Sequence, residues 1–218
     1  MKVIKKDLIN AEERIRNFIK DEDRQPNLLK LGAGNIKKEQ YLDLFYRVNQ
    51  FRVNRGRWPE FATVLGTNNS AAPQDYQNDK YSCGPASLSM GSAALFNYKT
   101  EQAFRNACGT TVNGTTPQKL IAGAAKLGFN LTRIPRNKVE CKKSLDKGRP
   151  VLAHIQTKKA PCLRYKNDYG HYILIKDIIN NNYLTNDPTM GENKLCNTVM
   201  LDLATGGRSI YYYSMSLK

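Results

Sequence analysis

Apolar residues near the start of the chain recur at steps of three and four positions, which places them on one face of a helix. The same stripe returns 33 residues later, and the two stripes comprise Leu8, Ala11, Ile15 and Phe18, then Tyr41, Leu44, Val48 and Phe51. Several residues are identical at this shift: Lys5, Arg14, Phe18, Arg24 and Pro26 match Lys38, Arg47, Phe51, Arg57 and Pro59. A unit this short buries too little surface alone, so the sequence predicts two helical repeats that pack together.

Each predicted helix ends in a short polar turn with a proline, DEDRQP in the first copy and NRGRWP in the second. Proline cannot continue a helix and favours extended geometry in the residue before it. A short apolar segment follows each turn, NLLKLG and then EFATVLG. We therefore predict a small all-α repeat domain over residues 1–66. The pattern alone favours an ordinary helical hairpin with no binding role.

The pattern changes after a polar stretch, Thr67 to Asp79, which is typical of a linker. Helical patterns follow at 83–98, 99–107, 117–127 and 138–146. Short runs rich in β-branched and aromatic residues then predict strands at 150–156, 172–179, 183–186 and 209–217. Helices first and strands afterwards predict an α+β domain with a mostly antiparallel sheet over residues 67–218.

Composition narrows the class of protein. Of 218 residues, 40% are hydrophobic, enough for a core, yet no stretch approaches the roughly 18 apolar residues of a transmembrane helix. The start of the chain carries acidic residues where a signal peptide has its apolar segment. We therefore expect a soluble protein that does not bind membranes. It should be made in the cytoplasm without a signal peptide, so another factor must release it if it acts outside the cell.

The chain is basic, with 34 Lys and Arg against 19 Asp and Glu and a net charge of +15. The excess is spread over the chain without a run of five like charges or a nucleic-acid motif, so we do not expect nucleic acid as a partner. A diffuse positive field fits an anionic wall polymer. It fits a merely soluble basic surface equally well.

The five cysteines lie at 83, 108, 141, 162 and 196. An odd number without a CxxC pair argues against a zinc site and against a complete disulfide framework, and it leaves at least one thiol free. Cys162 and Cys196 flank the region of His171 and Asp187 in polar, loop-like stretches, so a bridge between them is one of the pairings that the sequence allows.

Cys83 begins the first predicted helix of the second domain, in Cys83-Gly84-Pro85. A helix N-terminus stabilises a thiolate, and a neighbouring imidazolium lowers the pKa of the thiol further. Gly84 leaves space beside the sulfur, and Pro85 suits a first helical turn. Taken alone, this motif favours a small core cysteine without a catalytic role. The histidines and their neighbours change that balance.

The chain has two histidines, so a catalytic base must be His154 or His171. His154 lies inside a predicted strand, opposite apolar neighbours, and is expected to be a sheet residue. His171 opens a strand after Tyr169-Gly170, at a position from which its ring can reach a thiol. We therefore predict His171 as the base.

Two further residues complete the candidate site. Asp187 precedes Pro188 at a predicted strand end, from which its carboxylate can orient the ring of His171. Gln77 lies six residues before Cys83 on the loop that leads into the helix. Its amide and the backbone N–H of Cys83 can both point at a developing oxyanion.

The candidate site residues and their neighbours occur in an order similar to that of the papain-like cysteine peptidases. They are Gln77, Cys83-Gly84-Pro85, Gly148-Arg149-Pro150-Val151, Gly170-His171-Tyr172 and Asp187-Pro188. It most resembles the bacteriocin-leader (double-glycine) peptidases, over roughly Pro73 to Lys218. The resemblance implies a papain-like α+β domain in which Cys83, His171 and Asp187 form the triad and Gln77 lines the oxyanion hole.

The N-terminal repeats resemble the pseudomurein-binding repeat of methanogen wall proteins, through Tyr41-Leu42-Asp43, Arg47-Val48, Phe51 and Gly56-Arg57-Trp58-Pro59. The first copy departs most, with Asn10 and Glu12 in place of Asp43 and Phe45, so we expect it to serve mainly packing. Joined to a Cys-His-Asp peptidase, such repeats resemble the pseudomurein endoisopeptidases, the lysis enzymes of methanogen viruses.

That resemblance implies cleavage of the bond between alanine and a lysine side chain in pseudomurein cross-bridges, with the wall polymer as partner and the host wall as the place of action. It also implies a divalent cation, calcium, although the sequence contains no EF-hand loop and the chemistry itself requires no cofactor. We expect a monomer. The alternatives are a leader-processing peptidase without the usual transporter segments, a non-catalytic wall-binding protein, and a transglutaminase-like acyl transferase.

Overall fold

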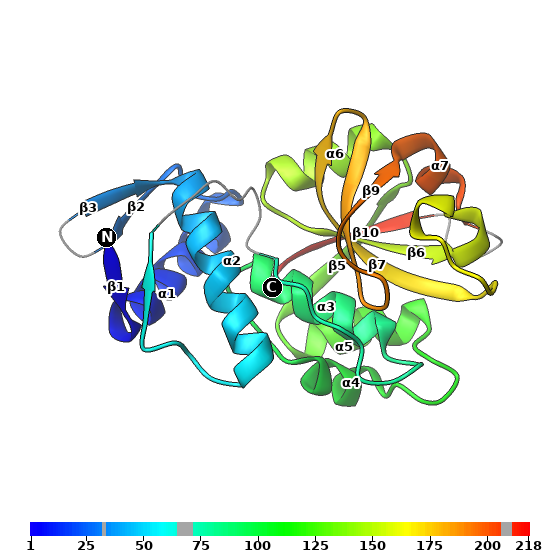
Figure 1. Ribbon diagram of the computed structural model, residues 1–218, viewed down its shortest axis with the longest axis horizontal. Helices are drawn as coiled ribbons and strands as arrows, with labels where there is room; N and C mark the ends of the chain where they lie inside the picture. The colour runs from blue at the N-terminus through cyan, green and yellow to red at the C-terminus, as the bar shows by residue number, and fades with distance from the viewer. Residues whose placement is uncertain (32–33, 65–71, 206–210) are drawn as a thin grey trace.

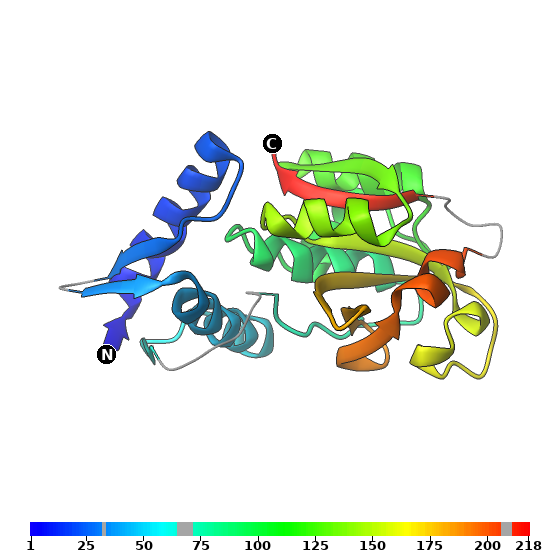
Figure 2. The same cartoon turned by 90° about the horizontal axis from the view of Figure 1, so that it is seen from above.

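The computed structural model describes residues 1–31, 34–64, 72–205 and 211–218. The N-terminal elements lie to one side of a larger part that mixes helices with a sheet (Figures 1 and 2). These N-terminal elements are β1 (Lys2–Ile4), α1 (Lys5–Glu22), β2 (Leu28–Leu31), β3 (Gly34–Lys37), α2 (Lys38–Arg55) and β4 (Phe61–Thr63). No helix in these described ranges is long and apolar enough to cross a membrane.

The internal repeat is visible in the contacts as well as in the sequence. Lys5 N–H donates to the carbonyl of Glu60 at 2.8 Å, and Lys38 N–H, 33 residues later, donates to that of Asn27 at 2.9 Å. The Arg14 guanidinium donates to the Lys30 carbonyl at 2.5 Å, and the matching Arg47–Thr63 bond measures 2.6 Å. Both helices end at a residue in the left-handed region, Asp23 and Gly56. The two copies therefore have the same local structure.

The prediction of an all-α repeat domain is wrong, because each copy is a strand, a helix and a second strand. The first strand of one copy pairs antiparallel with the last strand of the other: β1 with β4, and β3 with β2. The sequence analysis recognised the apolar segment after each proline but not its pairing. Strands of three and four residues are too short to show a clear alternation in sequence. The boundary predicted between residues 66 and 67 lies outside the described residues and stays a prediction.

Glu12 explains why the first copy departs from the second. Its side chain is buried between the helices and forms a 2.7 Å ion pair with Arg52. In the second copy the matching position is Phe45, which lies in the apolar core. A buried carboxylate requires a charged partner, and α2 provides it. The polar residue in the first copy thus fastens α1 to α2.

The second part begins with helices and continues with strands. Its helices are α3 (Cys83–Ala94), α4 (Glu101–Cys108), α5 (Pro117–Lys126), α6 (Lys138–Asp146) and α7 (Thr198–Leu203). Its strands are β5 (Phe129–Pro135), β6 (Val151–Gln156), β7 (Gly170–Ile179), β8 (Asn182–Asp187), β9 (Gly191–Asn197) and β10 (Tyr211–Leu217). Two short 3-10 turns, η1 (Thr157–Lys159) and η2 (Pro161–Leu163), lie between β6 and β7.

Within the described residues the strands form one antiparallel sheet in the order β5-β10-β6-β7-β8-β9. Alternate residues of each strand face opposite layers. Leu152 and Leu174 pack with α3, α4 and α5, whereas Val151 and Ile173 pack with α6 and α7. Figure 1 shows α3, α4 and α5 on one side of the sheet and α6 on the other. The predicted α+β class and antiparallel sheet are confirmed.

The predicted helices and strands correspond closely to α3–α6, β6, β7, β8 and β10, although residues 209 and 210 of the last strand lie outside the described ranges. The elements β5, β9 and α7 were not predicted from the sequence. Residues of β9 such as Glu192, Asn193 and Lys194 are mostly polar because the strand lies at the edge of the sheet. An edge strand need not be apolar, so its pattern gave no strand signal.

The N-terminal part is packed firmly against the second part. Phe96, just after α3, is fully buried among N-terminal side chains and lies edge-on to the rings of Tyr41 and Phe45. Its backbone is left-handed, with a φ of 57°, a conformation that side chains other than glycine rarely adopt. The Asn49 side-chain amide also donates to the Ala93 carbonyl, at 3.1 Å. The helix that begins at Cys83 is thus anchored at its other end in the repeats.

We expect Phe96→Ala to lower the free energy of unfolding by about 3–5 kcal/mol, because it empties a packed aromatic site. Urea unfolding of the full chain measures this. Phe61→Ala is the matched control, since Phe61 is 52% exposed, and it should cost less than about 1 kcal/mol. Equal costs for the two variants would contradict the idea that Phe96 joins the two parts.

Candidate active site

The thiol of Cys83 lies at the first residue of α3, where the backbone N–H groups of the helix are still unpaired. Every residue of the helix after Cys83 is buried. A Cβ atom on Gly84 would lie 2.9 Å from Leu120 Cδ1 and 3.3 Å from a ring carbon of Tyr172. A side chain at this position would require Leu120 or Tyr172 to shift, so glycine favours the close approach of α3 to α5 and β7. The thiol is half-buried and is one of three free thiols in the described residues.

The ring of His171 lies beside this thiol at the start of β7. It is 1% exposed, and its Nε2 atom lies 3.0 Å from Asp187 Oδ1. The other ring nitrogen, Nδ1, is therefore left for Cys83. Burial alone would lower the pKa of the imidazole, but the charge of Cys83 and the hydrogen bond to Asp187 raise it from 6.5 to about 9.

The same pairing acts on the thiol. Burial opposes ionisation of Cys83, but the charge and hydrogen bond of His171 outweigh it, together with hydrogen bonds from the backbone of Tyr172 and Gly84. The pKa of the Cys83 thiol is therefore below its ordinary value. A lowered thiol pKa beside a raised imidazole pKa describes a thiolate–imidazolium pair, which is the reactive form of a catalytic cysteine.

Asp187 ends β8 and is fully buried. Its Oδ1 atom accepts the backbone N–H groups of Thr189 at 2.8 Å and of Met190 at 3.0 Å. Burial would raise the pKa of the carboxyl group, but the hydrogen bond and charge of His171 and these N–H groups lower it overall. The carboxylate is thus held ionised behind the His171 ring.

Gln77 lies on the chain that leads into α3, and its side-chain amide is fixed at both ends. Its Nε2 atom donates to the Asp79 carbonyl at 2.7 Å, and its Oε1 atom accepts the Thr189 hydroxyl at 3.0 Å. The backbone N–H of Gln77 also donates to the Pro188 carbonyl, at 3.1 Å. One hydrogen of the amide remains for a ligand, as an oxyanion donor requires.

A surface cleft of about 450 Å³ joins these residues. Its lining residues are Gln77, Lys80, Tyr81, Cys83, Val112, Asn113, Gly114, Tyr169, Gly170, His171 and Thr189. Gln77, Cys83 and His171 therefore face one space, and Asp187 supports it from behind. The structure brings together all four residues that the sequence singled out.

His154 does not line this cleft. It lies within β6, opposite Tyr172 in the sheet register, and its ring stacks on that of Tyr172 with centroids 4.2 Å apart. The prediction that it is a sheet residue agrees with this position.

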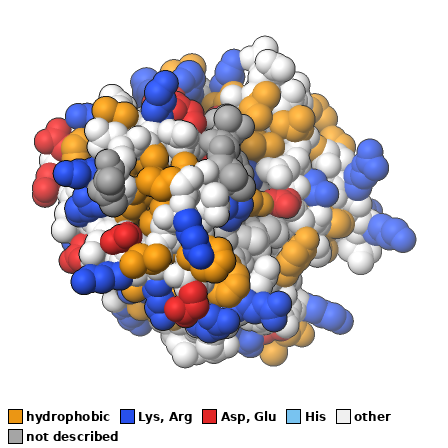
Figure 3. All heavy atoms as spheres, turned by 60° about the vertical axis from the view of Figure 1, so that its left-hand side comes forward, with side chains coloured by type: hydrophobic (Ala, Val, Ile, Leu, Met, Phe, Trp, Pro, Cys, Tyr) orange, Lys and Arg blue, Asp and Glu red, His pale blue; other side chains and the backbone are white. Residues whose placement is uncertain are grey.

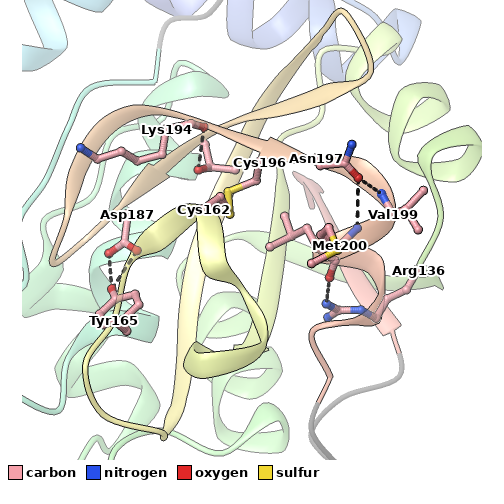
Figure 4. The surroundings of a disulfide bond; sticks show 11 residues. Arg136, Cys162, Tyr165, Asp187, Lys194, Cys196, Asn197, Val199 and Met200 are labelled. Atoms are coloured by element: carbon pink, nitrogen blue, oxygen red, sulfur yellow. Dashed lines mark hydrogen bonds between the residues drawn. A yellow bond between two sulfur atoms is a disulfide. The ribbon is translucent and has the colours of Figure 1, made fainter.

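Tyr165 is a site residue that the sequence analysis missed. Its hydroxyl lies 2.7 and 2.8 Å from the two carboxylate oxygens of Asp187 (Figure 4). It also lies 2.9 Å from His171 Nε2. Tyr165 belongs to an irregular segment without periodicity, and no motif points to it. The only usable signal was its closeness in sequence to Cys162.

Cys162 and Cys196 form a disulfide, one of the pairings that the sequence allowed. It joins η2 to β9, close to Tyr165 and Asp187 (Figure 4). Cys108 and Cys141 are buried free thiols. Burial raises the pKa of both, for Cys108 to about 11, so both are unreactive at neutral pH.

A family model, Peptidase C39 family, matches residues 72–203, which is more than half of the chain. The chain belongs to the Peptidase C39 family. It is therefore a cysteine peptidase, and its helix-and-sheet part has the papain-like α+β fold of this family. Among curated proteins, no sequence matches this C39 peptidase.

Solved structures support the fold assignment. The peptidase domain of Streptococcus ComA, a bi-functional ABC transporter involved in quorum sensing, matches with a TM-score of 0.52 and 19% identity, over 66% of this chain and 98% of that chain. A putative C39-like peptidase from Bacillus anthracis matches with a TM-score of 0.53 and 13% identity, over 67% of this chain and 95% of that chain. A double glycine motif protease from an AMS/PCAT transporter, solved in complex with the leader peptide, matches with a TM-score of 0.50 and 17% identity. The match covers 67% of this chain and 91% of that chain.

We expect the activity of this C39 peptidase to persist below pH 8.5, the ordinary pKa of a thiol, and to fall as the pH rises through about 9. The lowered pKa of Cys83 preserves the thiolate on the acid side, and loss of the His171 proton ends the ion pair on the alkaline side. A profile of kcat/KM against pH measures both limbs. A single rise near pH 8.5, without an alkaline fall, would contradict the ion pair.

Proposed function

We propose that this C39 peptidase hydrolyses the isopeptide bond between alanine and a lysine side chain in the cross-bridges of archaeal pseudomurein. It would act at the wall of a methanogen host, as the lysis enzyme of a virus or provirus. The observation that carries the proposal is the presence, in one chain, of the thiol–imidazole–carboxylate cleft and of two repeats that resemble pseudomurein-binding repeats.

The reaction follows from the arrangement of the side chains. The Cys83 thiolate attacks the alanine carbonyl, and the oxyanion is stabilised by the Gln77 amide and the Cys83 N–H. His171 gives its proton to the leaving lysine amine, and an acyl-enzyme remains. His171 then takes a proton from water, whose oxygen attacks the thioester; the C–S bond breaks, the alanine carboxylic acid leaves, and the Cys83 thiolate and His171 imidazolium are restored. Asp187 keeps the His171 ring oriented throughout.

The surface of the cleft suits a polymeric substrate. The side chains of Tyr81, Val112 and Tyr169 are 36%, 68% and 40% exposed along its walls, where a peptide can pack on them. Lys80 is also exposed at the cleft, and the described lining residues include no carboxylate. Together with the net charge of +15, this favours an anionic polymer.

The repeats present a matching pair of aromatic and basic side chains at the surface. The Arg24 guanidinium lies over the Phe18 ring at 5.0 Å, and Arg57 lies over Phe51 at 5.3 Å. The two arginine side chains are 50% and 63% exposed. Figure 3 shows Lys and Arg side chains spread between hydrophobic patches on this side of the molecule. An aromatic ring beside a cation suits a sugar polymer that carries carboxylates.

The calcium requirement implied by the resemblance finds no support in the side chains. Among the residues that the structure describes, no three His, Cys, Asp or Glu side chains gather into a metal-binding cluster. The steps proposed above need only the side chains named there, and calcium stays an expectation from the resemblance. Pseudomurein is the proposed partner, and we propose that the enzyme acts as a monomer without nucleic acid or membrane.

A double-glycine leader peptidase is the second candidate. The structure of the AMS/PCAT protease was solved with a leader peptide, and its fold is similar. The repeats favour the wall polymer, because the described N-terminal part is a separate pair of strand-helix-strand units rather than an extension of the sheet. The two candidates differ in their product, a free lysine side-chain amine or a new glycine carboxylate.

We expect Cys83→Ala and His171→Ala to abolish clearing of pseudomurein sacculi and release of amines, whereas His154→Ala keeps activity and loses mainly stability. Turbidity and newly released amines are followed together, with a double-glycine peptide as a parallel substrate. Cleavage of the peptide alone would favour the leader peptidase. An active His171→Ala beside a folded, inactive His154→Ala would overturn the choice of base.

We expect Arg24→Ala with Arg57→Ala, made in the full chain, to weaken binding to sacculi more than Lys20→Ala with Arg55→Ala. Both pairs remove two positive charges from exposed positions on the repeats, but only the first pair lies over an aromatic ring in both copies. Co-sedimentation over a salt series, with Cys83→Ala added to prevent cutting, measures binding. Equal weakening would assign binding to charge alone. No weakening would mean that the repeats are structural.

A further inference from the structure

The hydroxyl of Tyr165 lies between the two groups that orient the catalytic thiol. It donates its single proton to the Asp187 carboxylate, whose oxygens are 2.7 and 2.8 Å away. Its lone pair faces His171 Nε2 at 2.9 Å. A bridge of this kind fixes the carboxylate and the imidazole relative to each other, because each contact depends on the position of the other two groups.

The Tyr165 ring adds a second constraint. It lies 5.3 Å from the His171 ring in an edge-on arrangement, and 5.6 Å from the ring of Tyr169. Tyr165 is not among the residues that line the cleft. Its hydroxyl contacts to His171 and Asp187 are therefore the direct connection to the catalytic thiol, and its ring also contacts Tyr169, which lines the cleft.

The segment that carries Tyr165 has little regular structure of its own. The short turn η2 ends just before Tyr165. The neighbouring Arg164 adopts a left-handed conformation with a φ of 56°. The segment is fastened instead at two points. Cys162 is bonded to Cys196 on β9, and Thr157 binds the backbone of Asn167 and Tyr169 at its far end.

We propose that Tyr165 is a positioning residue of this peptidase, which locks Asp187 and His171 together, and that the Cys162–Cys196 disulfide holds Tyr165 in place. This inference rests on the proposed roles of Cys83, His171 and Asp187, but not on the identity of the substrate. Without the hydroxyl, the His171 ring gains freedom and holds the Cys83 thiolate less well. The chemical step should slow while substrate binding is unchanged.

The first test needs no substrate. Iodoacetamide alkylates thiolates, and Cys108 and Cys141 are buried, so the rate reports on Cys83, with Cys83→Ala as the blank. The ionisable groups that share the cleft with the thiol are His171, Tyr169, Lys80 and Tyr81, and Asp187 and Tyr165 lie behind His171. Tyr165→Phe keeps the ring and should slow alkylation at neutral pH roughly tenfold, with the pH midpoint of the reaction moved upward.

Tyr183→Phe is the matched control. Tyr183 is a buried tyrosine of the same sheet whose hydroxyl donates to a carboxylate, Asp202, at 2.9 Å, far from the cleft. Because neither Tyr183 nor Asp202 lines the cleft, this variant should lose stability to a similar degree and keep the alkylation profile. If Tyr165→Phe is folded and alkylates like the unaltered protein, or if both variants change alike, the proposal is wrong. A Cys83 of ordinary reactivity in the unaltered protein would instead contradict the proposed catalytic site.

A double-mutant cycle separates positioning from a general structural effect. On a small alanyl-ε-lysine isopeptide, Tyr165→Phe should lower kcat roughly 10- to 100-fold with KM unchanged. In an Asp187→Asn background the same change should have little further effect, because the two residues act through one ring. Cys162→Ala with Cys196→Ala should lower kcat in the same direction and remove most of the effect of Tyr165→Phe. Additive losses in these backgrounds would overturn the proposal.

Discussion

The buried carboxylate of Asp187 is the constraint on which the site depends. A charge without solvent is costly unless several donors surround it, and each donor here is also part of the active site. His171 and Tyr165 approach it from one side, and the N–H groups of Thr189 and Met190 approach from the turn after β8. The hydroxyl of Thr189 and the carbonyl of Pro188, in the same turn, hold Gln77. One turn therefore orients both His171, through Asp187, and Gln77.

The same residue connects the site with the repeats. The side-chain amide of Gln74 donates to the backbone carbonyl of Asp187 at 2.9 Å, and its own backbone exchanges two hydrogen bonds with the Gln50 side chain on α2. Phe96 makes a second connection, at the end of α3. The repeats are thus not attached as a loose tether. They contact the end of α3 directly, and they reach Asp187 at the end of β8 through Gln74.

Cys83, His171 and Asp187 could be singled out from the sequence because each lies beside glycine or proline where an element begins or ends. Signals of this kind depend only on neighbouring residues in the chain. His171 was ranked above His154 for the same reason. Tyr165 depends on a contact with a residue 22 positions later, in a segment with no period, and nothing local marks it. The strands of the repeats were not predicted, because each of them pairs with a strand of the other copy. The pairing of Cys162 with Cys196 could not be decided from the sequence, because sequence does not determine which cysteines lie close together in the fold.

The disulfide gives the molecule two opposite redox requirements. Cys83 must stay reduced, since oxidation of a reactive thiolate to sulfenic acid removes the nucleophile. The bond between Cys162 and Cys196 must stay oxidised, and a dithiol reductant that rescues Cys83 can also open it. Such bonds persist in oxidising compartments and are rare in the cytosol. The arrangement described here therefore exists only within a range of reduction potential in which the Cys83 thiol is reduced and the Cys162–Cys196 disulfide is still formed.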